Sequence, residues 1–417
     1  MKKLLTAILT LFLVLPMTAP FATAQMPDFD PASEPDANAF FNEGGNSGGQ
    51  RQRGEGRRGK RPDGQRPDGK KRGGKRGEKG QRPPRGHRAD ADSARRFFVY
   101  GVAFYNLENL FDTINNNGKF DLEFSPEGRR QWDSEKYNAK LRNLARTIAS
   151  MSSPVTPYGP AIIGVSEVEN RSVLEDLVKR PELSARNLQI VHHDSPDRRG
   201  IDVGLLYDPE LFEVVDVTNT PLIVEGNPDF RTRDQMCVTG VLAGDTLSVI
   251  VNHWPSRLGG QEESSYLREA AAKLSRHIAD SLHALRPNQH VIMMGDLNDD
   301  PQDRSCAVAF GAKRDASEVG PSDYYNPWWE TLDGGYGTLC YRGKWNLFDQ
   351  IIVSGTLLVP DSEGLHYLSN RINVFDFLVQ KEGNYRGYPH RTFAGNQWLN
   401  GYSDHFPTEI FLLKEAR

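Results

Sequence analysis

Short apolar segments rich in β-branched and aromatic residues recur along the chain from Phe97 onward, and clusters of Gly, Pro, Asn and Asp separate them. Segments of this length and composition predict β-strands. We expect strands that begin at Phe97, Ala161, Leu188, Ile201, Leu211, Cys237, Leu247, His290, Phe348 and Phe406.

Two segments, 136–151 and 262–285, instead repeat apolar residues at intervals of three and four positions. This spacing predicts two helices, each with one buried face. The repeating residues are Tyr137, Leu141, Leu144 and Ile148 in the first segment and Leu267, Ala271, Leu274, Ile278 and Leu282 in the second. Many strands with few helices over about 320 residues predict one large α/β domain with mixed sheets, and we place it at residues 93–417.

Residues 1–24 have the pattern of a secretory signal peptide: two lysines, an apolar run over 4–15, and small residues at 22–24. We expect cleavage before Gln25 and export of the mature protein to the periplasm or outside the cell. The apolar run is shorter than the ~20 residues that a transmembrane helix needs, and no other segment approaches that length. An uncleaved membrane anchor is the alternative.

Residues 25–92 form a low-complexity tail with almost no aliphatic side chains. A segment of this composition cannot bury enough apolar surface to fold, so we expect it to be disordered. Between Arg51 and Arg88 the tail holds 16 Lys/Arg and 4 Asp/Glu. This basic stretch fits an arm that binds nucleic acid or an anionic surface, and it fits a solvated spacer equally well. The lack of aromatic residues within it argues against base stacking there.

The remainder of the chain is acidic. Residues 89–417 hold 33 Lys/Arg and 46 Asp/Glu, a net charge of −13, and the whole chain carries −4. Because proteins that bind duplex DNA are usually basic along the binding groove, this acidity weakens the case for a nuclease. A cation bound to catalytic carboxylates would offset part of the excess, and the basic tail would offset some of the rest.

Three cysteines in an exported protein leave at least one unpaired. Cys237 lies in an alternating strand segment, and we expect it to be free and buried. Cys306 and Cys340 either form a disulfide or remain free, and the sequence favours neither outcome. No cysteine spacing is typical of a zinc site.

Polar residues cluster at the ends of the predicted strands. Pairs two positions apart, such as Asn106 with Glu108 and Asp296 with Asn298, are expected to point to the same face of a strand. Carboxylates gathered on one side of a sheet repel each other unless a cation neutralises them, and oxygen ligands favour Mg²⁺, Mn²⁺ or Ca²⁺. Histidines beside carboxylates are candidates for general acid–base catalysis. Residues 192–193, both histidine, have no evident carboxylate partner and are interpreted as surface residues.

Seven motifs follow one another in the order FYNLENLFD, SEVEN, RGIDVGLLYD, VNHWPSR, GDLNDDP, FDQIIVS and YSDHFP. In this order they resemble the successive motifs of the endonuclease/exonuclease/phosphatase superfamily, the fold of DNase I and the AP endonucleases. The resemblance covers the chain from Phe97 to Leu413 and does not cover the tail. It implies an α/β four-layer sandwich of two packed mixed β-sheets flanked by helices, with the strand ends meeting in one cleft.

The resemblance also implies a site for Mg²⁺ or Mn²⁺. Glu167 matches the main metal-binding carboxylate of the superfamily. Asn106 and Glu108 would lie beside it, with Asp404 near the second side of the ion. Structural Ca²⁺, which stabilises the DNase I-like branch, cannot be located from this sequence.

The catalytic roles follow from the same resemblance. His405 matches the catalytic histidine and Asp349 the carboxylate that orients it. Asp296 and Asn298 match the pair that positions or activates water and holds a phosphate oxygen. His253 matches a second histidine that protonates the leaving group. Either the His405–Asp349 pair or Asp296 would take the proton from water, and both assignments stay open.

Two aromatic-rich stretches, 324–345 and 384–402, directly precede Asp349 and Asp404. Rings and arginines beside a phosphate site can stack bases and bind the backbone of a nucleic acid. The alternative, favoured for most single rings, is that they fix long loops to the domain. The candidate substrate contacts are Asn252, Arg257, Arg233, Trp345 and Arg391, of which Arg233 is equally explained as a solvated residue.

The function we expect is endonucleolytic hydrolysis of extracellular DNA or RNA by a monomer. His253 within NHWPS, followed by Arg257, favours the DNase-like branch, and export argues against DNA repair. A phosphatase or a phospholipid or inositol phosphoesterase of the same fold is the alternative, since fold does not determine function. A non-catalytic surface-binding module is disfavoured because it would not need the complete set of site residues.

Overall fold

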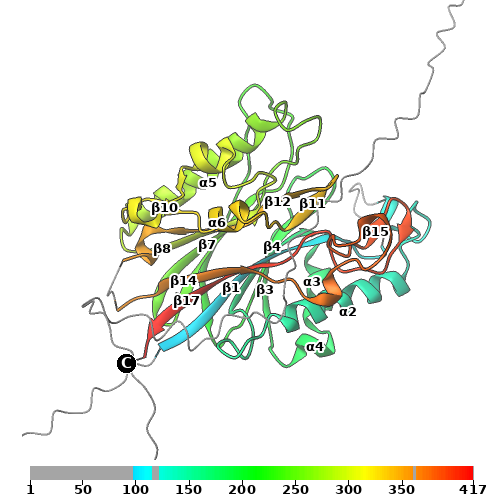
Figure 1. Cartoon of the computed structure of the whole chain (residues 1–417), viewed down its shortest axis with the longest axis horizontal. Coiled ribbons are helices and arrows are strands. Elements are labelled where there is room, and N and C mark those ends of the chain that lie inside the picture. Colours follow the sequence, from blue (N-terminus) through cyan, green and yellow to red (C-terminus); the bar gives the residue numbers. More distant parts are fainter. Residues whose placement is uncertain (1–96, 115–121, 360–362, 417) are drawn as a thin grey trace, which may run out of the picture. The chain divides into compact units, whose positions relative to one another are not determined.

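The computed structural model describes residues 97–114, 122–359 and 363–416 (Figure 1). The expected signal peptide (1–24) and tail (25–92) lie outside these described residues. All ten expected strands are present, each beginning within two residues of its predicted start. They belong to two large mixed sheets.

The first sheet has six strands, with β1 and β2 parallel and the other neighbours antiparallel. Its order is β14 (His366–Ile372), β17 (Thr408–Glu415), β1 (Phe97–Leu110), β2 (Ile162–Val168), β4 (Asp202–Tyr207) and β3 (Gln189–His192). The edge strand β14 was not predicted. Apolar and polar residues alternate only weakly along this strand, because neither of its faces is fully buried.

The second sheet has seven strands, and its parallel neighbours are β7 with β8 and β9 with β10. Its order is β5 (Phe212–Thr220), β6 (Gln235–Leu242), β7 (Asp245–His253), β8 (His290–Asp296), β13 (Asp349–Ser354), β10 (Tyr324–Tyr325) and β9 (Ala312–Lys313). Two small hairpins lie outside both sheets: β11 (Leu339–Tyr341) with β12 (Lys344–Asn346), and β15 (Phe393–Ala394) with β16 (Gln397–Trp398).

Both predicted helices are present, as α2 (Ser134–Ser150) and α5 (Ser265–Leu285). The expectation of only two helices was too low, because short helices lack enough turns to show a periodic pattern. The further helices are α3 (Arg171–Val178), α4 (Pro181–Ser184) and α6 (Trp329–Asp333). Single 3-10 turns occur at η1 (Leu122–Phe124), η3 (Ala316–Glu318), η4 (Gly355–Leu357), η5 (Asp376–Leu378) and η6 (Gly383–Tyr385), and η2 (Ser305–Phe310) is a short π-helix.

Alternation along the strands divides the core into layers. On β1, Val102 and Phe104 pack between the two sheets, whereas Ala103 and Tyr105 face α2 and α3 on the outer side of the first sheet. Helix α5 covers the outer face of the second sheet. The predicted four-layer α/β sandwich is therefore confirmed (Figure 1).

The three cysteines are buried and free, so Cys306 and Cys340 do not form a disulfide. The free state expected for Cys237 is confirmed. Its burial raises the pKa of the thiol to about 11.

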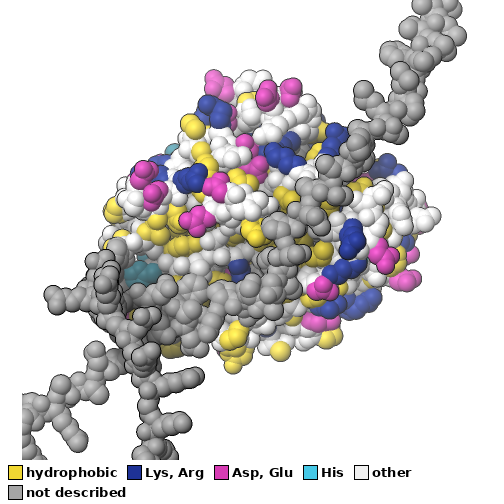
Figure 2. All heavy atoms as spheres, viewed as in Figure 1, with side chains coloured by type: hydrophobic (Ala, Val, Ile, Leu, Met, Phe, Trp, Pro, Cys, Tyr) yellow, Lys and Arg dark blue, Asp and Glu magenta, His cyan; other side chains and the backbone are white. Residues whose placement is uncertain are grey.

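On the face of the molecule shown in Figure 2, basic and acidic side chains are interspersed over the described residues. None of the helices within 97–114, 122–359 and 363–416 combines the length and the hydrophobicity that crossing a bilayer requires.

Gly295, the residue before Asp296 on β8, has no room for a side chain. A Cβ there would lie 2.2 Å from the backbone oxygen of Asn252 on β7. We expect Gly295→Ala to lower the free energy of unfolding by at least about 2 kcal/mol, measured by urea denaturation. The control is Gly226→Ala, where φ is also positive at 76° but a Cβ would meet nothing within 4 Å. Equal losses in the two variants would contradict the steric explanation.

Candidate active site

Three neighbouring strands place His253, Asp296 and Asp349 side by side. In the pairing of β7 with β8, His253 lies opposite Asp296, and in the pairing of β8 with β13, Asp349 lies opposite Asp296. All three residues are buried. Because these strands lie far apart along the chain, the register of the sheet is what brings the residues together.

His405, in the loop before β17, completes this row. Its Nδ1 lies 2.6 Å from Asp349 Oδ2, which also accepts a hydrogen bond of 2.5 Å from Thr338 Oγ1. The other ring nitrogen, His405 Nε2, is 3.8 Å from Asp296 Oδ2, and His253 Nε2 is 3.6 Å from the same oxygen. Two imidazoles therefore flank one carboxylate oxygen.

A β-bulge brings Glu167 to the same place from the other sheet. The register between β2 and β4 shifts at this residue, whose φ is 59°. Its Oε2 accepts a hydrogen bond of 2.9 Å from the backbone nitrogen of Asn109, and its Oε1 lies 4.0 Å from His253 Nε2. A regular strand would have aimed this side chain differently, since bulges redirect the side chains they contain.

Asn106 connects the first sheet to the row. Its Nδ2 donates a hydrogen bond of 3.0 Å to Asp296 Oδ2. The expectation that Asn106 and Glu108 share a strand face is wrong, because φ is 47° at Glu108 and 53° at Asn109. These left-handed residues interrupt the alternation on which that expectation relied.

Glu108 instead lies among cationic groups. Its carboxylate accepts a hydrogen bond of 2.7 Å from the backbone nitrogen of Thr392 and lies 3.8 Å from Lys140 Nζ and 3.5 Å from Arg391 Nε. Burial raises the pKa of Glu108, Asp404 adds to this, and the two cations oppose it. The structure therefore commits both oxygens of Glu108 to these groups and does not direct them toward Glu167.

Asp404 is held by an arginine. Arg391 Nη2 donates a hydrogen bond of 2.8 Å to Asp404 Oδ2, and the other oxygen lies 4.0 Å from His405 Nε2. Burial opposes ionisation of Asp404, but Arg391 and His405 outweigh it, so the pKa of this carboxyl is lowered. Asp404 thus stays ionised beside the row, and Arg391 binds it in the absence of substrate.

Asn298 follows the row by two residues and has a φ of 51°. Its backbone nitrogen donates to Asp296 Oδ1 at 3.0 Å, and its Nδ2 donates to the carbonyl of Trp254 at 3.0 Å. Asn298 therefore stands next to Asp296 through its backbone. The simple alternation expected for the two residues does not apply, because β8 ends at Asp296.

Two residues that were expected to contact substrate make hydrogen bonds inside the fold instead. Asn252 is fully buried, with its Nδ2 near the carbonyls of Ile250 and Met294 and its Oδ1 accepting from Trp254 and Ser275. Arg257 donates to the carbonyl of Asn298 and to Asp303. The structure does not bring Asn252 to the site, and it uses Arg257 to support the Asn298 turn.

Arg233 is a third such residue. Its guanidinium donates to the carbonyls of His253 and Trp254, at 3.1 and 2.7 Å, and pairs with Asp197 at 3.1 Å. It is buried, so both a phosphate contact and a solvated side chain are excluded for this arrangement. Arg233 instead holds the backbone that carries His253.

The aromatic-rich stretches divide into two groups. Tyr324 and Trp328 are fully buried in the core, as the alternative interpretation stated for most rings. Trp345 is only partly buried and stacks on Phe406, with ring centroids 5.9 Å apart, and Tyr388 lies against it at 6.3 Å. Because Phe406 follows His405 directly, Trp345 packs on the segment that carries His405.

Three site residues were not predicted. Thr338 binds Asp349, and Lys140 is a buried lysine that donates to Thr392 and to the carbonyl of Tyr402. Burial lowers the pKa of Lys140 to about 8. A signal for Lys140 was present, since it lies on the apolar face of the predicted helix. Nothing in the sequence marks Thr338.

Arg199 is the third of these residues and lies at the mouth of the site. Its Nη2 donates a hydrogen bond of 2.6 Å to Asn109 Oδ1 and lies 3.7 Å from Glu167 Oε2, and half of its side chain is exposed. The motif RGIDVGLLYD, which begins at this arginine, was its sequence signal. Its position makes it available to an anionic ligand.

The two imidazoles have opposite protonation preferences. Burial lowers the pKa of His253 well below 6.5, and Arg233 and Arg199 lower it further. Burial also opposes protonation of His405, but Asp349 and Asp296 outweigh it and raise the pKa well above 6.5. Burial raises the pKa of Asp296 to about 6. The surroundings of the row thus favour the neutral form of His253 and the protonated form of His405.

The residues present fit an oxygen-ligated divalent cation. The carboxylates of Asp296 and Glu167 converge from the two sheets, with oxygens 3.6 and 4.0 Å from the same atom, His253 Nε2, and Asp349 adds a third carboxylate beside Asp296. Asp349 Oδ1 is buried without a hydrogen-bond partner. Oxygen donors without sulfur favour Mg²⁺ or Mn²⁺, and structural Ca²⁺ stays a prediction.

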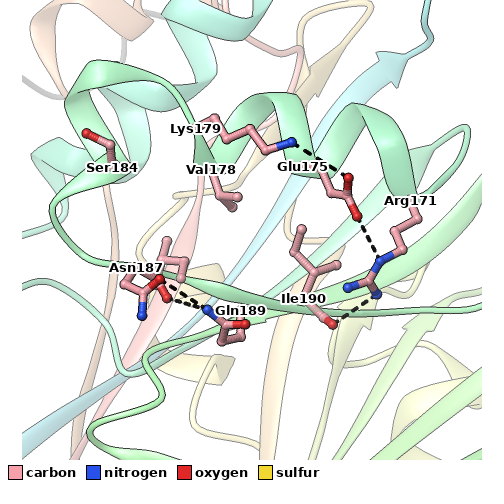
Figure 3. A pocket seen from close by; sticks show the side chains of 9 residues that line it. Arg171, Glu175, Val178, Lys179, Ser184, Asn187, Gln189 and Ile190 are labelled. Carbon is pink, nitrogen blue, oxygen red and sulfur yellow. Dashed lines mark hydrogen bonds and ion pairs between the residues drawn. The ribbon is translucent and has the colours of Figure 1, made fainter.

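A separate hollow lies between α3 and β3, away from this row (Figure 3). Its charged side chains pair with one another, with Glu175 accepting from Arg171 at 3.1 Å and lying 3.7 Å from Lys179. None of the site residues lines it.

A buried row of carboxylates and imidazoles at the strand ends of a four-layer α/β sandwich is an arrangement suited to phosphoester hydrolysis. The model of the Endonuclease/Exonuclease/phosphatase family matches residues 101–414, and the chain belongs to this family. Its members are phosphoester hydrolases. A search of curated protein sequences found no match.

Several solved structures are similar to this chain. A mannosyl-6-phosphatase from Bacteroides thetaiotaomicron is 17% identical, covering 75% of this chain and 99% of its own, with a TM-score of 0.47. Another endonuclease/exonuclease/phosphatase family protein from B. thetaiotaomicron is 17% identical, covering 77% and 100%, with a TM-score of 0.46. TDP2 from D. rerio, complexed with a single-strand DNA product, is 13% identical, covering 75% and 98%, with a TM-score of 0.46.

Asp349→Asn should lower the pKa of His405, because the charge that best opposes the effect of burial is removed. An NMR titration of the imidazole in metal-free protein measures this. The raised pKa of His405 stabilises the fold fully below pH 6.5, and this contribution is lost as pH rises through the folded-state pKa. Unfolding by urea at several pH values should therefore show that Asp349→Asn reduces this pH dependence, because Asp296 and Asp404 still raise the pKa of His405. Asp303→Asn is the control, and an unchanged His405 pKa in Asp349→Asn would contradict the assignment.

Proposed function

We propose that this protein is an exported, divalent-metal-dependent phosphodiesterase that acts as an endonuclease on extracellular DNA or RNA. The observation that carries the proposal is the pair of imidazoles on either side of Asp296. Hydrolysis of a diester needs one group to accept a proton from water and another to protonate the departing oxygen. Two histidines and a carboxyl within hydrogen-bonding reach of one reacting phosphate meet this need.

The geometry supports particular roles for the chain's own residues. Asp349 binds Nδ1 of His405, so Nε2 is the nitrogen that faces the reacting groups. Because the surroundings of His405 favour its protonated form, Asp296 would accept the proton from water; His405 with Asp349 would do so only once a bound cation lowers the pKa of His405. His253, whose surroundings favour the neutral form, would donate a hydrogen bond from Nε2 to the leaving oxygen.

Glu167 would hold the cation, with Asn106 and Asp404 beside it. When bound, the ion would supply neutralisation of the phosphate oxygens and a lower pKa for attacking water. Glu108 would contribute through Lys140 and Arg391, whose positions it fixes, because its own oxygens are already engaged.

A polymeric substrate is supported by the surroundings of the row. Arg199 and Arg391 are partly exposed on two sides, and the partly buried Trp345 packs on the segment that carries His405. Guanidinium groups bind backbone phosphates, and exposed rings stack on bases. The basic tail would add affinity that falls with salt.

A phosphatase, or a phospholipid or inositol phosphoesterase, is the second candidate. The observation that favours it is the acidity of the folded part, whose charges are interspersed on the face in Figure 2 rather than gathered in a basic stripe. This candidate predicts cleavage of small or lipid esters and no salt-dependent binding of DNA.

His405→Ala and His253→Ala should each lower the rate of phosphodiester cleavage by about 10²- to 10⁴-fold, because each removes a group that would donate a proton or a hydrogen bond to the reacting oxygens. Mature protein would be assayed on plasmid DNA, RNA and small phosphoesters with Mg²⁺, Mn²⁺, Ca²⁺ or EDTA. Activity should vanish with EDTA. His277→Ala, an exposed histidine on α5, is the matched control and should retain full activity.

The assay separates the two candidates. Cleavage of nucleic acid identifies the nuclease, and cleavage of a small ester alone identifies the phosphatase. Well-folded protein that cleaves nothing with any of the metals would contradict the catalytic assignment itself.

Arg199→Ala should raise KM for the phosphodiester by about 10-fold with little change in kcat, because it removes one charge-assisted hydrogen bond to substrate. Arg198→Ala is the matched control, since this exposed neighbour donates to the carbonyl of Asp229 instead. Equal changes in the two variants would indicate a general charge effect rather than a specific contact.

A further inference from the structure

The hairpin between β3 and β4 carries a second group of metal-ligating side chains, at His192, Asp194 and Asp202. The strand pairing sets His192 opposite Gly204, and continuing that register sets Asp194 opposite Asp202. Residues two apart in a hairpin share a face, so all three side chains lie on one face with Gly204, which has none to compete. One ligand atom from each lies within 4.8 Å of the others.

His192 is the unusual member of this group. The interpretation of His192 as a surface residue without a carboxylate partner was wrong, because the hairpin register is not visible in the sequence. Its side chain is 3% exposed, and its Nε2 lies 3.5 Å from Asp202 Oδ2. That separation is longer than a normal hydrogen bond, and Nε2 has no hydrogen-bond partner. Buried polar atoms are rarely left in this state.

Asp202 is oriented toward this nitrogen. The backbone nitrogen of Ser195 donates to Asp202 Oδ1 at 2.8 Å, and the Ser195 hydroxyl donates to the same oxygen. These two bonds fix the carboxylate so that Oδ2 faces His192. Oriented carboxylates and imidazoles of this kind are typical of prepared metal sites.

We propose that His192, Asp194 and Asp202 bind a divalent transition-metal ion of the zinc class. One imidazole with two carboxylates suits Zn²⁺ better than Mg²⁺ or Ca²⁺, which take oxygen ligands almost exclusively. Two ligands about 2.0–2.1 Å from a tetrahedral ion lie about 3.3 Å apart, close to the separation of His192 Nε2 and Asp202 Oδ2. The ion would satisfy the buried nitrogen.

This site is separate from the catalytic row and would act on the shape of the hairpin. It joins the end of β3, the loop and the start of β4. The same loop carries Arg199, which contacts Asn109 and approaches Glu167. A bound ion would thus hold the loop that presents Arg199 to the mouth of the site.

The test counts zinc bound to the full chain and measures its affinity by competition with a chromophoric chelator. Wild-type protein should bind one more zinc ion per chain than His192→Gln, and the affinity at this site should weaken at least about 10-fold in the variant. Asp194→Asn should give the same loss, and its exposed position leaves folding intact. His193→Gln, the exposed neighbouring histidine, is the matched control and should bind like wild type.

Trypsin provides a second measurement. Zinc should slow cleavage after Arg198 and Arg199 in wild-type protein and in His193→Gln, but not in Asp194→Asn. Equal zinc content in all four proteins would overturn the proposal and leave His192 and Asp202 as a simple ion pair. Loss of the ion in His193→Gln as well would also overturn it. If His192→Gln does not fold, Asp194→Asn decides the outcome.

Discussion

The pairing register of β7, β8 and β13 is the constraint on which the rest of the site depends. It sets His253, Asp296 and Asp349 in one row, and a slip by one residue would turn Asp296 to the opposite face of the sheet. The apolar residues of the same strands pack between the sheets and against α5, so the core maintains the register. The hydrogen bond from Asn106 then ties the first sheet to this row. The positions of the catalytic residues are therefore set by the packing of core residues that lie outside the site.

Several residues of the site have a left-handed backbone conformation. They lie where a regular strand would point the side chains away from the site. Glu108, Asn109, Glu167 and Asn298 all have positive φ, which costs about 1–2 kcal/mol for each such residue. The site offsets part of this cost with its own contacts. The backbone nitrogen of Asn109 binds the Glu167 carboxylate, and that of Asn298 binds Asp296. The strained segments thus hold the catalytic carboxylates in place, and the hydrogen bonds to these carboxylates in turn stabilise the strained segments.

The strands and the two long helices followed from local patterns, because alternation and helical spacing are properties of neighbouring residues. The layer order, and the placement of His405 and Asp349 in one site, followed instead from the resemblance of the motifs to the superfamily. Three features did not follow. The bulge at Glu167 is set by strand pairing, and the burial of Arg233 depends on carbonyls that only the fold supplies. The position of Lys140 beside Glu108 required the docking of a loop more than 200 residues away, which no local pattern encodes.

The placement of β17 has a consequence for when activity can arise. This strand lies inside the six-stranded sheet, between β14 and β1, and so pairs the end of the described chain with its beginning. His405 lies in the loop just before it. Contacts of such long sequence separation form late in folding, because a long loop must close first. During synthesis the nascent chain therefore has neither a finished first sheet nor His405 until the ribosome has passed β17, and a hydrolase of this design stays inert up to that point.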